Sequence, residues 1–214
     1  MWGLLPKSLY CIKIQYFDMS YAELHCLSNY SFLRGASHPS ELVEQAVHLG
    51  YSALAITDEC SLAGVVKAHV VAKELDFKLI IGSEFNVSEG LRLVAIAPSR
   101  AAYGELSNLI SRSRRRSEKG QYLTHLRDIY FHLKRCFIIW LPTHIDEEKH
   151  HADILSRRFA DRFWIGVTQL LHHDDTTRLT ELQQIASELK APLIACGSVE
   201  TVSYTHLTLP TTEY

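Results

Sequence analysis

The sequence predicts an α/β fold with a parallel sheet or barrel, and three observations support this. Three short apolar strands follow one another within residues 21–87, and helical segments separate them. Each strand ends in residue types that can bind metal or move a proton, namely His25, Asp58 and Glu84. The chain has 214 residues and is 47% hydrophobic and 21% charged, which suits one soluble domain with a sizeable core. Because the carboxyl ends of parallel strands face one side, chemistry is expected there.

The first two helices are predicted from their start and stop signals and their apolar spacing. One covers residues 39–49, since Pro39 suits the first helical position and Gly50 the position just past the end. The second covers residues 62–75. The side chains expected on its inward face are Leu62, Val65, Val66 and Val70.

The remaining elements follow from the same signals and give seven strands alternating with helices. After the first, the expected strands cover residues 53–57, 78–81, 91–97, 137–141, 164–170 and 192–196. The later expected helices cover residues 101–113, 146–159 and 174–190. Residues 114–135 are polar and are predicted to be a loop with a helical piece.

Composition and charge exclude several classes of protein. The net charge of −2 gives no bulk attraction to nucleic acid or to an anionic membrane. No run of about 18 apolar residues predicts a membrane span, and the first residues do not resemble a signal peptide. The five cysteines are widely spaced, odd in number and without a CxxC pair, which favours reduced thiols in the cytoplasm.

Four stretches carry a family resemblance: ELHCLSNYSFLRGASHP, GYSALAITDECSLAGVVKAH, KLIIGSEF, and YGELSNLISRSRRR with the following KGQY. They resemble the N-terminal polymerase-and-histidinol-phosphatase (PHP) domain of bacterial C-family DNA polymerases, in particular the error-prone branch related to the polymerase III alpha subunit. The resemblance covers roughly residues 19–197. It implies a PHP-type distorted (β/α)7 barrel, incomplete at its C-terminus.

The resemblance also suggests boundaries, with the PHP domain over residues 19–200. Residues 1–18 match nothing in the family, and we interpret them as an extension from a misplaced start codon or as a short edge strand over residues 10–17. Residues 201–214 leave the family pattern. We interpret this tail as a sequencing or assembly artefact of a truncated gene fragment, with a divergent natural terminus as the alternative.

A PHP phosphoesterase site, by family resemblance, holds a cluster of divalent metals on His, Asp, Glu and sometimes Cys ligands. The family ligands retained here are His25, Asp58 and Glu84, with Glu59 as a substitute where a His is expected. The replacements at other ligand positions are Leu27 for a second His, Arg34 for an acid, Arg92 for a His, and Ser198 and Glu200 for an Asp-x-His pair.

These replacements predict a dismantled metal site. A guanidinium repels a metal ion and pairs with carboxylates, so we expect Arg34 or Arg92 to bridge Asp58 and Glu84. The alternatives are a single residual divalent metal on His25, Asp58 and Glu84, or a working phosphoesterase or proofreading nuclease. No catalytic residue and no cofactor is predicted for this fragment itself.

A basic run falls at the end of the third expected helix. It consists of Arg112, Arg114, Arg115 and Arg116, with Lys119 shortly after. Cations at a helix C-terminus offset the helix dipole, and we favour this interpretation. The alternative is contact with DNA phosphates or with the polymerase body.

The resemblance implies a non-catalytic structural domain of an error-prone DNA polymerase, a nucleotidyltransferase of DNA replication and repair. The intact protein would extend primers opposite damaged template in translesion synthesis, using Mg²⁺ held by acids of a palm domain. The implied partners are the rest of the polymerase chain, DNA and other mutagenesis proteins, with no membrane. The alternative is a free-standing metal-dependent phosphoesterase similar to histidinol phosphatase.

Overall fold

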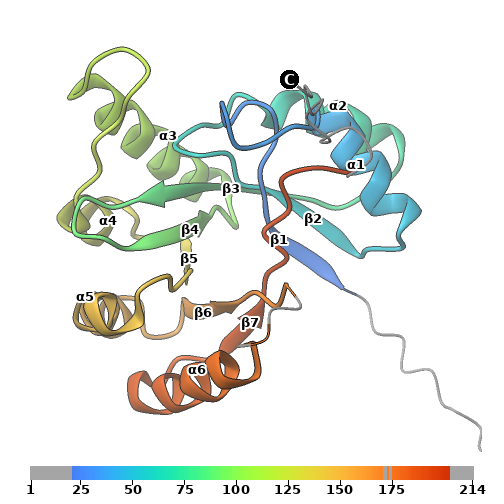
Figure 1. Cartoon of the computed structure of the whole chain (residues 1–214). Coiled ribbons are helices and arrows are strands. Elements are labelled where there is room, and N and C mark those ends of the chain that lie inside the picture. Colours follow the sequence, from blue (N-terminus) through green and yellow to red (C-terminus); the bar gives the residue numbers. More distant parts are fainter. Residues whose placement is uncertain (1–20, 171–172, 174, 203–214) are drawn as a thin grey trace, which may run out of the picture.

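The chain forms a strongly curved sheet with helices on its outside, seen in a computed structural model that describes residues 21–170, 173 and 175–202 (Figure 1). The strands are β1 (Ala22–Cys26), β2 (Ala53–Ile56), β3 (Leu79–Asn86), β4 (Arg92–Ile96), β5 (Phe137–Trp140), β6 (Phe163–Val167) and β7 (Leu193–Ala195). The helices are α1 (Pro39–His48), α2 (Val65–Glu74), α3 (Arg100–Arg115), α4 (Leu126–His132), α5 (Ile145–Arg158) and α6 (Asp175–Leu189).

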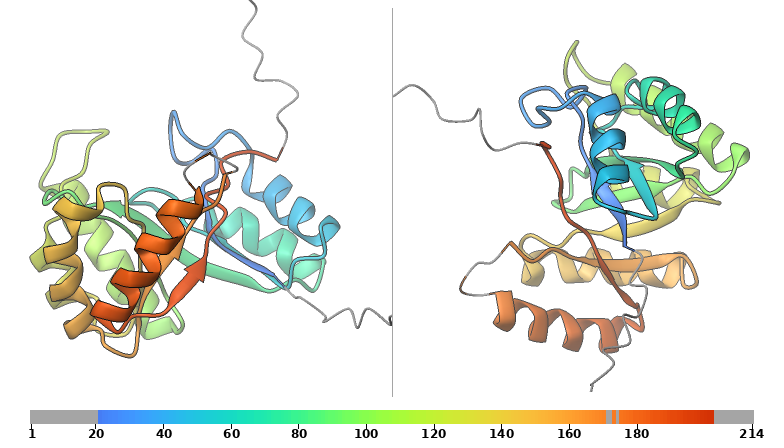
Figure 2. Two further views of the ribbon diagram at one scale, coloured as in Figure 1. Left: turned by 60° about the horizontal axis from the view of Figure 1, so that its bottom comes forward. Right: turned by 90° about the vertical axis from the view of Figure 1, so that its right-hand side faces the viewer.

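The strands pair in chain order from β1 to β7, which makes a nearly closed seven-stranded barrel. The α/β barrel expected from the sequence is therefore confirmed. Helices α1 and α2 lie beside the first strands, and α5 and α6 lie beside β6 and β7 (Figures 1 and 2). The interpretations of residues 1–18 and of the tail 201–214 concern residues that lie outside the described part of the chain, apart from residues 201 and 202.

One strand breaks the expected parallel pattern. β4 is antiparallel to both β3 and β5, whereas the other neighbouring pairs are parallel. The reason is that β3 continues through Glu84 to Asn86, and the connection 87–91 is too short for a crossover helix. Asn86 consequently pairs with Arg92, so the start of β4 lies at the carboxyl end of β3.

Two residues predicted to face inward on the second helix are exposed. Val66 and Val70 are 69% and 52% exposed, while Val65, Ala68 and Ala72 are buried. α2 packs against α1, and the small alanine side chains allow a close approach that the apolar spacing alone did not indicate. Leu62 and Val65 do pack in the core as predicted.

The segment after β7 covers the free edge of β1. Leu27 N donates to Val199 O at 2.8 Å, and Val199 N donates to His25 O at 3.0 Å. Figure 1 shows this segment running beside β1. These backbone hydrogen bonds partly cover the edge of β1 that would otherwise be unpaired. No helix in the described part of the chain is long and apolar enough to cross a membrane.

Candidate functional site

The retained family residues lie together at one end of the barrel, although two of them lie inside strands. His25 belongs to β1 and Glu84 to β3, while Asp58 and Glu59 follow β2. The side chains of His25, Asp58 and Glu84 are all buried. The three residues thus come from the first three strands and the turn after β2, and β1 and β3 extend past their expected ends.

A buried carboxylate joins a histidine to an arginine at the centre of the site. His25 Nε2 lies 2.6 Å from Glu84 Oε2. Arg34 Nη1 donates to Glu84 Oε1, and Nη2 lies 3.3 Å from Oε2. Burial alone raises the pKa of Glu84, but the hydrogen bonds from His25 and Arg34 outweigh it and lower this pKa to about 2. Glu84 therefore stays ionised at neutral pH, with its charge compensated inside the barrel.

Arg34 also reaches two further carboxylates. Its Nη1 lies 2.9 Å from Glu59 Oε2, and its Nη2 lies 3.6 Å from Glu200 Oε1. Glu59 additionally accepts hydrogen bonds from Tyr122 Oη and Asn86 Nδ2, both at 2.7 Å. Burial raises the pKa of Glu59, and these hydrogen bonds lower it further than burial raises it. One guanidinium thus holds acidic side chains from three separate segments.

Asp58 is satisfied by the loop after β1 and not by an arginine. Its oxygens accept from Ser28 N at 2.8 Å, from Ser28 Oγ at 2.8 and 2.9 Å, and from Ser31 Oγ at 2.8 Å. The prediction that an arginine bridges Asp58 and Glu84 is therefore wrong for Asp58. Arg34 links Glu84 to Glu59 and Glu200 instead. The two serines in SNYS are the feature of the sequence that indicates these hydrogen bonds to Asp58, because they place two hydroxyl donors near the end of the strand.

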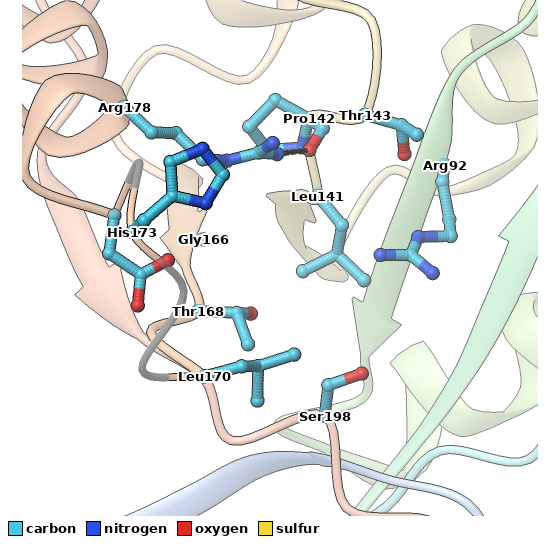
Figure 3. A pocket seen from close by; sticks show the side chains of 11 residues that line it. Arg92, Leu141, Pro142, Thr143, Gly166, Thr168, Leu170, His173, Arg178 and Ser198 are labelled. Carbon is cyan, nitrogen blue, oxygen red and sulfur yellow. Dashed lines mark hydrogen bonds between the residues drawn. The ribbon is translucent and has the colours of Figure 1, made fainter.

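Arg92 lines a separate cavity beside this network. The cavity has a volume of about 550 Å³, and Arg178, His173 and Ser198 also line it (Figure 3). Among the described residues, Arg92 Nε is buried and has no hydrogen-bond partner, and Arg178 donates to the carbonyl of Pro142. Arg92 forms no ion pair with Asp58 or Glu84 in the described part of the chain. Arg178 could not be recognised from the sequence, because a lone arginine on an amphipathic helix carries no signal.

The donor set does not fit the metal cluster of the family. Leu27 is fully buried where a second histidine is expected. Glu84 and Asp58 already accept hydrogen bonds from protein donors, and the Arg34 cation lies against Glu84. Within residues 21–170, 173 and 175–202, no group of three His, Cys, Asp or Glu side chains is placed to hold a metal ion.

The basic run on α3 divides into inward and outward side chains. Arg114 donates to the carbonyls of Cys60 and Glu59, each at 3.2 Å, and lies 5.2 Å from the Tyr122 ring. Arg116 pairs with Asp128. The other three, Arg112, Arg115 and Lys119, are exposed. Arg112, Arg114 and Arg115 lie in the last turn of α3, as predicted for cations at a helix C-terminus.

A family model described as "PHP domain" matches residues 23–147, which is more than half of the chain. The chain therefore belongs to the PHP domain family. Within that family its relatives include the error-prone DNA polymerase of Saccharophagus degradans, 51% identical over 183 residues. That of Teredinibacter turnerae is 50% identical over 177 residues. These matches cover 84% and 83% of this chain but only 18% and 17% of the two polymerases.

Solved structures confirm the architecture. A protein from Bifidobacterium adolescentis assigned as a metal-dependent phosphoesterase aligns with a TM-score of 0.61, 15% identity, and coverage of 86% of this chain and 88% of that one. An amidohydrolase from Chromobacterium violaceum aligns with a TM-score of 0.60 and 14% identity, over 85% and 88% of the two chains. At this level of identity the likeness concerns the fold alone.

Proposed function

We propose that this chain is the N-terminal PHP domain of an error-prone DNA-directed DNA polymerase and that its own role is structural. The polymerase would act in DNA replication and in translesion synthesis after DNA damage. The observation that carries the structural role is the position of Arg34, whose guanidinium lies among Glu59, Glu84 and Glu200. By family resemblance these acids occupy positions that bind or flank metals in active members, and here one fixed cation pairs with all three.

The physical consequence is a site without hydrolysis. A metal cluster supplies both charge for phosphate oxygens and hydroxide near neutral pH. Arg34 supplies charge alone, because a guanidinium stays protonated and cannot generate hydroxide. Burial lowers the pKa of Arg34, but its bonds to Glu84 and Glu59 outweigh this and raise it. Nucleotide addition, Mg²⁺ binding by a palm domain, DNA contact and association with other mutagenesis proteins are proposed for the intact polymerase, in the cytoplasm.

Metal content and phosphate-ester hydrolysis test this proposal together. The purified chain is stripped with chelator, incubated with Zn²⁺ or Mn²⁺, desalted and analysed for bound metal and for hydrolysis of p-nitrophenyl phosphate. We expect no stoichiometric metal and no hydrolysis above the protein-free rate. Two or more retained ions with metal-dependent hydrolysis would overturn the structural role and favour the free-standing phosphoesterase. One retained ion without hydrolysis would contradict only the statement about metal.

A further inference from the structure

An exposed apolar tip lies on the loop that joins β1 to α1. Phe32 and Leu33 are neighbours in the sequence, and they are 85% and 90% exposed. A single exposed apolar side chain on a protein surface is ordinary. Two adjacent large ones, both almost fully exposed at the end of one loop, form a contact point of the kind found at interaction sites.

The loop presents this tip on a well-defined base. Ser31 N donates to Ser28 O at 2.9 Å, and Arg34 N donates to Ser31 O at 3.0 Å. The hydroxyls of Ser28 and Ser31 bond to the buried Asp58. Leu33 adopts a positive φ of 64°, which a non-glycine residue keeps only where surrounding bonds hold it. A partner would therefore meet a preformed surface and pay little ordering entropy.

One exposed cation, Lys67, borders the base of the tip. Lys67 Nζ lies 5.6 Å from the ring centre of Tyr30, which precedes the tip, and Arg34 follows the tip directly. Arg34 remains 25% exposed despite its ion pairs. Arg34 is already paired with carboxylates of this domain, so Lys67 is the cation that a partner would meet. An apolar tip beside this cation fits an apolar pocket with an acidic rim.

The exit of the chain lies beside the same loop. Ala36 N donates to Glu200 O at 2.8 Å, and Val202 N donates to Ser37 Oγ at 3.0 Å. The Saccharophagus degradans polymerase continues well beyond the matched part, since this chain covers 18% of it. The described chain therefore leaves the domain beside Ala36 and Ser37, at the end of the loop that carries Phe32 and Leu33.

The size of the tip favours a partner in the same chain. Stable complexes between separate proteins bury about 800 Å² on each side, far more than two side chains provide. A covalently linked partner needs much less area, because the link gives an effective concentration of about millimolar. A second copy of this chain or a free protein would lack that advantage.

We infer that Phe32 and Leu33 insert into an apolar, acid-rimmed pocket of the polymerase region that follows this domain in the intact chain. This inference rests on the proposed structural role and assigns that role a specific contact. The inference assigns docking to the β1–α1 loop and not to the exposed valines of α2, Val66 and Val70.

The test compares the 214-residue chain with a chimera in which residues 21–200 replace the matching part of the Saccharophagus degradans polymerase. Hydrogen exchange is followed in the peptide covering residues 30–36. We expect exchange to slow by about tenfold or more in the chimera, because docking removes the loop from solvent. The variant F32S/L33S should restore the rate of the 214-residue chain. The matched control V66S/V70S, which removes two exposed valines from α2, should leave the protection unchanged.

Equal exchange of residues 30–36 in both proteins would overturn the docking inference. If other surfaces of the domain are protected in the chimera, the structural role stands and only the contact is wrong. If no part of the domain is protected, the structural role fails as well. Sedimentation of the 214-residue chain completes the test, since a dimer lost in F32S/L33S would assign the tip to self-association instead.

Discussion

At the scale of residues, the site depends on which acids Arg34 pairs with. Two neighbouring carboxylates follow β2, and Ser28 and Ser31 satisfy the first, Asp58. The second carboxylate, Glu59, therefore forms an ion pair with the Arg34 guanidinium, as Glu84 does. The replacement of an expected acid by Arg34 was visible in the sequence. The choice of its partners was not, because it depends on hydroxyl donors that only the folded loop brings to Asp58.

Replacing Arg34 tests the charge balance of this network. In Arg34→Leu, Glu84 keeps its burial and loses a permanently charged partner, which is expected to destabilise the fold by about 3–5 kcal/mol. Urea unfolding measures the effect. Arg115→Leu, on an exposed arginine of α3, serves as the control and should change the free energy of unfolding by about 0.5 kcal/mol or less. Equal effects in both variants would show that the Arg34 ion pairs contribute nothing.

The low pKa of Glu84 predicts acid sensitivity. Its pKa is about 2 in the folded chain, against an ordinary value of 4.5, so the folded state favours the ionised form. The resulting stabilisation is complete above the unfolded pKa and is lost as the pH falls from about 5 towards 2. Unfolding free energies at pH 5 and pH 3 should therefore differ more in the wild type than in Glu84→Gln. Glu44→Gln, at an exposed position, should retain the wild-type difference.

At the scale of elements, helix α2 shows how apolar spacing and packing can disagree. Val66 and Val70 share the apolar pattern of the helix but face solvent, and Ala68 and Ala72 make the buried contact. Side-chain size decides this, because α1 and α2 approach closely only where the residues between them are small. Hydrophobicity alone cannot distinguish a small contact residue from a larger exposed one.

A pair of substitutions on α2 checks this packing. Ala68→Leu adds atoms to a fully buried position and is expected to destabilise the fold by about 1–3 kcal/mol. Val66→Ser changes an exposed side chain and should cost about 0.5 kcal/mol or less. Thermal or urea unfolding of the two variants gives the comparison. A larger loss for Val66→Ser than for Ala68→Leu would mean that the helix is rotated relative to this description.

At the scale of the whole molecule, closure of the barrel depends on residues far apart in the chain. Val199 exchanges backbone hydrogen bonds with His25 and Leu27 of the first strand region, and Gly197 N donates to Glu23 Oε1 at 2.9 Å. A Cβ on Gly197 would lie 2.1 Å from Glu23 Oε2, so a side chain there would displace this carboxylate. The edge of β1 is thereby protected, and Glu200 is brought to Arg34.

Substitution of Val199 tests the closure. Val199→Pro removes the N–H that bonds to His25 and restricts Ser198, whose φ of 53° conflicts with a following proline. The expected loss is about 2 kcal/mol or more, with faster hydrogen exchange at Leu27 N. Val199→Ala keeps the backbone donor and should leave the exchange at Leu27 unchanged. Unaltered exchange in the proline variant would show that the segment after β7 does not cover β1.

By itself, the sequence determined the alternation of strands and helices and the family, and it predicted that Leu27, Arg34 and Arg92 replace metal ligands. These features are local, because they depend on residue type, on apolar spacing and on short motifs. Only the tertiary structure decided that β4 runs antiparallel, that Arg34 pairs with Glu59 and Glu200, and that Arg92 lies in a different cavity. These outcomes depend on which distant groups meet in the folded barrel and on which donors are already satisfied there.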